Sequence, residues 1–163
     1  MNPYEMPAEV FLFEKVPALL TRLTPETPAL WGLMDAQQMV EHVSLLFYIS
    51  QKEANTPCVT PPDKLERARQ FLFNQKPMRE NTKGPLMPDT PHPHRYPSLE
   101  EAIRRLLAHM EAYRTYHAEN PGATIMHPFF GQLTGAEWAL FHRKHLIHHL
   151  TQFGLLDRVP QEA

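Results

Sequence analysis

Four of the ten histidines in this 163-residue chain lie within eight consecutive residues, at His142, His145, His148 and His149. Neutral imidazole nitrogens are common ligands of divalent metal ions. Histidines four residues apart on a helix project from the same side. If this segment is helical, His145 and His149 can therefore bind one ion together.

The segment has a stripe of helical spacing at the place where the other predicted helices carry Leu, Ile and Met. The stripe consists of Trp138, His142, His145, His149 and Gln152, spaced four, three, four and three. Arg143, Lys144 and Thr151 fall on the far side. Burying a polar group without a partner costs about 1–3 kcal/mol. A row of buried imidazoles therefore needs a shared partner, and a divalent metal ion is one solution.

A further histidine, His42, lies on the inward stripe of the second predicted helix, between Met39 and Leu46. His42, His145 and His149 together predict a three-histidine metal site. Such a site keeps coordination positions open to water or substrate, as catalytic zinc sites do. His142, one turn further along, is a candidate fourth ligand.

Two other histidines are candidates for contact with a small-molecule substrate. His127 precedes the last helix, and His148 lies beside the stripe. No residue stands out as a general base, because Glu41, next to His42, is turned off the inward stripe. The catalytic residue is thus unknown from the sequence.

Interpretations without a metal remain open. The histidines can form a hydrogen-bonded network or a pH-sensitive core, in a metal-free dimerisation domain. His117, alone on an apolar face, is typical of a core histidine. His92 and His94, in a proline-rich stretch, are assigned to chance placement.

Several known site types are excluded by their motifs. His145 is followed by Leu146, so the H-E-x-x-H motif of zinc proteases is absent. No Glu has a His three residues later, as di-iron carboxylate proteins require. There is no glycine-rich phosphate loop and no G-x-S-x-G sequence. Cys58 lies in a proline-rich connection, which gives little support to a cysteine nucleophile.

Apolar periodicity predicts an all-α fold, a four-helix bundle with a short extra helix, in a single domain over residues 1–163. No segment alternates with period two, so no sheet is predicted. Pro17 should kink or split the first helix. The expected helices span 7–22, 35–53, 63–75, 98–120 and 134–153. The starts of three carry capping-box pairs: Asp35 with Gln38, Ser98 with Glu101, and Thr134 with Glu137.

Residues 77–97 contain six prolines and form a long loop rather than a helix. Long loops in compact domains are often functional. This proline-rich segment is either a wall or lid over a site or a surface strap without function.

The composition narrows the class of protein. Sixteen Lys and Arg against eighteen Asp and Glu give a net charge of −2, which does not favour nucleic-acid binding. The single cysteine fits a reducing compartment, and a cytoplasmic protein is expected. No apolar run approaches the ~18 residues of a membrane span, and no secretory signal is visible.

Two strings, H145-L-I-H-H-L-T-Q152 and Q37-Q-M-V-E-H42, resemble the DinB-like superfamily of small four-helix metal-binding proteins. That superfamily carries one histidine on its second helix and a His-x-x-x-His pair on its last long helix. The segments around residues 23–42, 81–88 and 127–156 resemble a less characterised branch of it, to which the proline-rich segment belongs.

The resemblance implies that His42, His145 and His149 hold a divalent ion, zinc or nickel in many members. It implies a hydrolase, or a transferase or isomerase that uses a low-molecular-weight thiol. A homodimer is expected from the resemblance and from the frequency of homodimers in general. A non-enzymatic module that binds a metal or a small ligand is the alternative.

Overall fold

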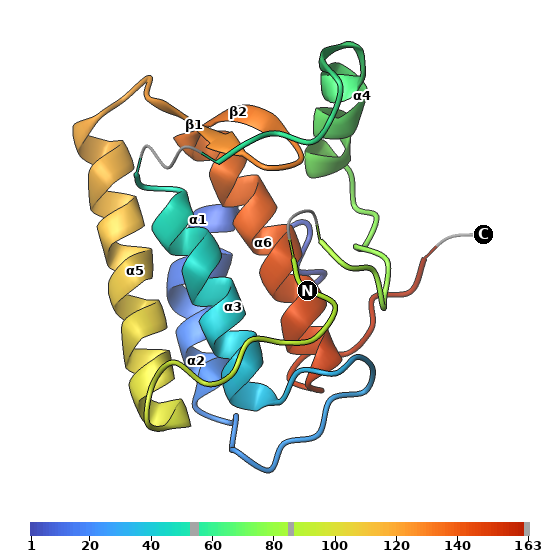
Figure 1. Ribbon diagram of the computed structural model, residues 1–163, viewed down its shortest axis with the longest axis vertical. Helices are drawn as coiled ribbons and strands as arrows, with labels where there is room; N and C mark the ends of the chain where they lie inside the picture. The colour runs from blue at the N-terminus through green and yellow to red at the C-terminus, as the bar shows by residue number, and fades with distance from the viewer. Residues whose placement is uncertain (53–55, 85–86, 162–163) are drawn as a thin grey trace.

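The computed structural model describes residues 1–52, 56–84 and 87–161, which form helices and one antiparallel pair of strands (Figure 1). The all-α prediction is wrong, because residues 124–134 form a β-hairpin. Long helices lie side by side, and the hairpin and a short helix lie at one end of them (Figure 1). The fold is therefore mixed rather than a bundle of helices alone.

The N-terminal helix begins where expected but changes its pitch in the middle. It runs through α1 (Ala8–Val10), a π-helical turn (Phe11–Lys15) and α2 (Val16–Leu20). Pro17 has no N–H to donate to the preceding turn, and a widened turn accommodates that loss. The helix is therefore not split at Pro17; it runs on with a π turn just before the proline.

Two helices start at the predicted caps and pack along each other. In α3 (Ala36–Ile49), Asp35 and Gln38 form a reciprocal capping box. In α5 (Leu99–Glu119), Ser98 accepts from the Glu101 N–H, while the Glu101 carboxylate pairs with arginines instead of reaching back. The α3 helix ends at Ile49, earlier than predicted, and Glu53 lies outside the described residues.

The hairpin was missed because its strands are very short. β1 (Thr124–His127) and β2 (Gly131–Thr134) pair from Thr124–Thr134 to His127–Gly131. Burial alternates along both strands, but four residues give too short a pattern for a sequence-based prediction of period two. The Trp138 indole N–H donates to the carbonyl of Ile125 at 3.0 Å, which ties the hairpin to the last helix.

The last helix, α6 (Gly135–Gln152), is surrounded on every side. It begins with the predicted capping box of Thr134 and Glu137. Its far side is also covered: Lys144 is 1% exposed and donates to Asn74 at 3.0–3.1 Å and to the carbonyl of Lys76. Lys144 lies on the far side from the histidine stripe, as predicted, and the segment after α4 (Leu65–Gln70) packs over it.

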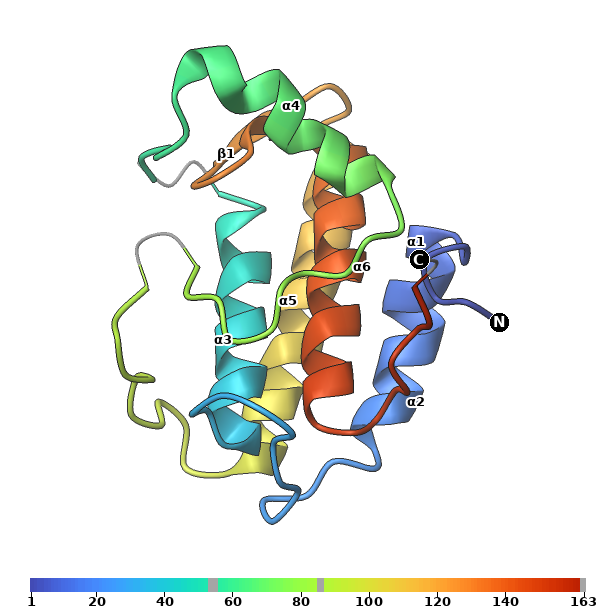
Figure 2. The ribbon, with the colours of Figure 1, turned by 90° about the vertical axis from the view of Figure 1, so that its right-hand side faces the viewer.

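The proline-rich segment has no regular secondary structure in its described parts, 77–84 and 87–97; Pro85 lies outside them. Figure 2 shows residues 77–84 crossing in front of α6 toward α3, and the later residues running beside α3. The segment thus covers the face that α3 and α6 share. Among the described residues, no helix combines the length and apolarity that crossing a bilayer requires.

Candidate metal centre

The rings of His42, His145 and His149 meet between α3 and α6. Nε2 of His42 lies 3.0 Å from Nε2 of His145, and Nε2 of His149 lies 3.1 Å from the same atom. His145 and His149 are each 6% exposed. The predicted convergence of three ring nitrogens from two helices is therefore present in the fold.

Gln152 determines which nitrogen of His149 faces the cluster. Its side-chain N–H donates to the carbonyl of Trp31 at 2.9 Å, so its oxygen is the atom that faces Nδ1 of His149, at 2.7 Å. This network assigns the proton to Nδ1 of His149 and leaves a lone pair on Nε2. Gly32 makes room for the amide, because a Cβ there would meet Nε2 of Gln152 at 2.8 Å.

The two short contacts of His145 cannot both be hydrogen bonds between neutral rings. A bond to the lone pair of His149 requires a proton on Nε2 of His145, and that proton cannot also point at His42. If His42 donates instead, two lone pairs face each other across the 3.1 Å contact. A cation that accepts all three lone pairs removes the conflict.

Protonating the rings does not resolve the conflict either. Burial lowers the pKa of His42 to about 4, with smaller contributions from His148 and His92. Burial also holds the pKa values of His145 and His149 well below the usual histidine value. The three rings are therefore neutral near pH 7, which is the state that binds metal ions.

The distances from Nε2 of His145 to Nε2 of His42 and of His149, 3.0 and 3.1 Å, fit a divalent ion. Zinc–nitrogen bonds of about 2.0–2.1 Å at angles of 90–109° place the nitrogens about 3.0–3.4 Å apart. Within the described ranges, the group that could hold an ion consists of these three histidines. An ion held there would have at least one position left for another ligand.

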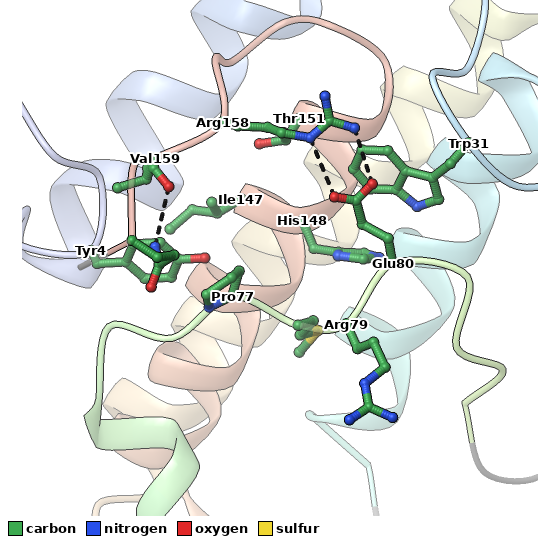
Figure 3. Close-up of a pocket in the computed structure, with 12 residues that line it drawn as sticks. Tyr4, Trp31, Pro77, Arg79, Glu80, Ile147, His148, Thr151, Arg158 and Val159 are labelled. Atoms are coloured by element: carbon green, nitrogen blue, oxygen red, sulfur yellow. Dashed lines mark hydrogen bonds and ion pairs between the residues drawn. The ribbon is translucent and has the colours of Figure 1, made fainter. Parts of the chain in front are cut away.

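His148 lies beside the cluster and lines a neighbouring cavity of about 410 Å³ (Figure 3). Its ring contacts those of His149 and Trp31, with centroids 4.9 and 5.4 Å apart. In Figure 3, the ion pair of Glu80 and Arg158, at 3.0–3.2 Å, lies above His148. The substrate contact predicted for His148 thus has a cavity to occur in.

His142 and His127 lie outside the cluster. His142 is fully buried, stacks on Phe47 with centroids 3.7 Å apart, and pairs through Nε2 with the Ser50 hydroxyl at 2.9 Å. It is not part of the candidate metal group. His127 is 4% exposed, and its Nδ1 accepts the N–H groups of Phe129 and Phe130.

Sequence reasoning missed the position of His92. His92 and His42 line the same second cavity. The two residues are fifty positions apart in the chain, and His92 lies in a loop without periodicity, so no sequence pattern could reveal that they share it. His117 is half-buried and has a protein partner outside the cluster, with Nε2 donating to the carbonyl of Ser50 at 2.7 Å.

Comparison with protein families gives one match, over residues 62–154, to a family described as Protein of unknown function (DUF1569). The match covers more than half of the chain. The protein belongs to the DUF1569 family. No curated protein and no solved structure matches it.

The DUF1569 match runs from the short helices before the proline-rich segment to the end of α6. It therefore includes His145, His149 and Gln152 but begins after α3, which supplies His42. The family description assigns no activity, so the argument about function rests on the geometry of the three histidines.

Proposed function

We propose that this DUF1569 protein is a metal-dependent enzyme of the DinB-like type, with a divalent ion, zinc or nickel, held by His42, His145 and His149. The reaction class is hydrolysis, or transfer or isomerisation with a low-molecular-weight thiol. The observation that carries the proposal is the position of Nε2 of His145, 3.0 Å from that of His42 and 3.1 Å from that of His149, two contacts that neutral rings cannot both satisfy with protons.

A bound divalent ion lowers the pKa of a water or thiol at its open position, which makes a nucleophile available near neutral pH. The protein's own residues orient the ligands. Gln152 holds the tautomer of His149, and the ring of Phe141 stacks on that of His145, with centroids 5.0 Å apart. Such support from surrounding groups is worth about 10- to 100-fold in metal affinity.

The second candidate is a non-enzymatic module that binds a metal or small ligand. The observation that favours it concerns Glu41, the carboxylate next to His42. Its oxygens accept from the N–H groups of Arg95 and Tyr96 and from the Gln37 side chain, at 2.7–3.2 Å. Glu41 is thus committed to holding the loop and is poorly placed to act as a general base.

Metal analysis of the purified protein, followed by titration of the chelated protein with Zn²⁺ and Ni²⁺, tests the metal site. Wild type should bind one ion per chain. His145→Ala should lose at least about two orders of magnitude in affinity, because each of three or four ligands carries about 3 kcal/mol of a typical 10–16 kcal/mol. His117→Ala, which removes a histidine outside the cluster, should bind like wild type.

A wild-type protein that is purified without metal and ignores both added ions would refute the site. So would a His145→Ala variant that binds as well as wild type. Ester, phosphate-ester and thiol-transfer substrates then separate the two candidates. Turnover that is lost with chelator supports the enzyme, whereas a lower melting temperature with chelator and no turnover supports the binding module.

A further inference from the structure

A cavity of about 730 Å³ opens beside His42, between α3 and the second half of the proline-rich segment. Its size lies within the range of small-molecule sites, about 300–1,000 Å³. Apolar side chains such as Met34, Leu45 and Met87 form part of its lining. The cavity therefore offers an apolar space with a candidate metal ligand in its wall.

The loop that forms the outer wall is held in place by α3. Gln38 donates to the carbonyl of His92 at 2.9 Å, and His94 pairs with Asp35 at 2.7 Å. Glu41 accepts the backbone N–H of Arg95 at 2.7 Å. The backbone at residues 92–95 is thus bonded to α3 beside His42, through Gln38 and Glu41, and the residues His92 and Arg95 line the cavity.

The acidic and basic side chains around this cavity differ in whether they already have a partner within the protein. Glu41 is the acidic residue in its lining, and its oxygens are occupied by N–H groups of the loop and Gln37. Within the described ranges, no carboxylate lies within ion-pair distance of the Arg95 guanidinium. Among the described residues the guanidinium has no hydrogen-bond or ion-pair partner, so its N–H groups can donate to a ligand.

A metal ion at the cluster adds to the positive character. The three histidine ligands are neutral, so a divalent ion would keep its full charge of +2 at the site. Together with Arg95, it would present two positive centres to one cavity. Arg binds carboxylates through a planar fork of two parallel hydrogen bonds.

We propose, on the basis of the proposed metal site, that the cavity beside His42 binds a small organic anion with two binding ends. A carboxylate at one end pairs with the Arg95 guanidinium, and a metal-binding group at the other end reaches the ion held by His42, His145 and His149. Arg95 is thus the residue that selects anionic over neutral ligands.

The test uses the full-length protein loaded with Co²⁺, whose visible absorption reports ligands at the metal, and two thiols of equal chain length. The anionic probe is 3-mercaptopropionate, and the neutral probe is 3-mercapto-1-propanol. Wild type should bind the anionic probe about 10- to 100-fold more tightly, the range of a hydrogen bond to a charged group. Arg95→Gln should bring the two affinities within about twofold by weakening the anionic probe alone.

Arg79→Gln is the matched control, because Arg79 is not among the residues that line the cavity beside His42. It belongs to the lining of the cavity beside His148, where its side chain extends away from the other lining residues in Figure 3. It should keep the wild-type preference, and Arg95→Lys should keep part of it. The proposal is overturned if wild type does not prefer the anionic probe, or if the preference survives in Arg95→Gln, as it would if the carboxylate chelated the metal. Failure to bind Co²⁺ refutes the metal site itself, and this proposal with it.

Discussion

The two halves of α6 carry histidines on the same stripe but use them differently. In the first half, His142 is enclosed among aromatic rings and bonded to Ser50. In the second half, Nε2 of His145 lies 3.0 Å from Nε2 of His42 on another helix and 3.1 Å from Nε2 of His149. The comparison shows that a buried histidine is structural when the nitrogen that faces a neighbouring helix bonds to a protein group, as Nε2 of His142 does to Ser50. It is a candidate ligand when that nitrogen meets the lone pairs of other histidines instead.

His142 and His149 differ in which ring nitrogen bonds to a polar partner in the protein. The Ser50 hydroxyl donates to the carbonyl of Phe47 at 2.8 Å, so it accepts the Nε2 proton of His142 and ends that chain of bonds inside the protein. Gln152 instead accepts the Nδ1 proton of His149, which leaves Nε2 free to face the cluster. Ser50 therefore occupies Nε2 of His142, whereas Gln152 leaves Nε2 of His149 without a proton.

Acidification should have the largest effect on stability. Burial lowers the folded-state pKa of His42 to about 4 and of His127 to about 3, and it lowers those of His142, His145 and His149 as well. Below the unfolded value of about 6.5, protons bind the unfolded state first, so stability falls as the pH falls toward the folded pKa. At pH 5, the shifts of His42 and His127 each cost about 2 kcal/mol, and the lowered pKa values of the other three histidines add to the loss.

Urea unfolding of the metal-free protein between pH 7.5 and 5 measures this loss. His127→Asn keeps an acceptor for the backbone N–H groups and removes one titrating group. Unfolding of this variant should therefore take up about one proton fewer, and its unfolding free energy should fall less steeply as the pH is lowered. Saturating metal should reduce only the loss of stability that comes from His42, His145 and His149. Stability that is flat from pH 7.5 to 5 would contradict the assignment of neutral buried rings.

Removing the two polar partners should separate the two halves of α6. Gln152→Leu frees the His149 ring to change tautomer, and we expect metal affinity to fall about 10- to 100-fold. Ser50→Ala leaves the Nε2 proton of His142 buried without a partner, which costs about 1–3 kcal/mol of stability. Its metal affinity should stay within twofold of wild type. Chelator competition and urea unfolding measure the two quantities, and equal metal affinities in the two variants would remove the distinction.

The smallest effect concerns two glycines in left-handed backbone. Gly32 has φ +82° and Gly154 has φ +71°, so Ala at either position costs about 1–2 kcal/mol of backbone strain. Only at Gly32 would the new Cβ meet Nε2 of Gln152, at 2.8 Å. Gly32→Ala should therefore also lower metal affinity several-fold, while Gly154→Ala should not. The same chelator competition checks this, and unchanged affinity in Gly32→Ala would show that Gln152 adjusts freely.

Much of the helical structure could be predicted from local patterns. The capping boxes at Asp35 and Thr134 are confirmed, as is the start of a helix after Ser98. Capping depends on residues three apart, so the sequence displays it directly. The hairpin at 124–134 was predicted as a loop, because its stability comes from packing on α6 rather than from strands long enough to show a pattern.

The sequence by itself determined that one helix face carries histidines at ligand spacing and that another helix carries His42. Both statements follow from helical periodicity, which is a local property of the chain. Only the tertiary structure decided that Ser50 closes off His142, that Lys144 is buried, and that the loop at His92 and Arg95 lies beside His42. Those contacts join residues tens of positions apart, and their identity depends on how the helices and the irregular loop pack.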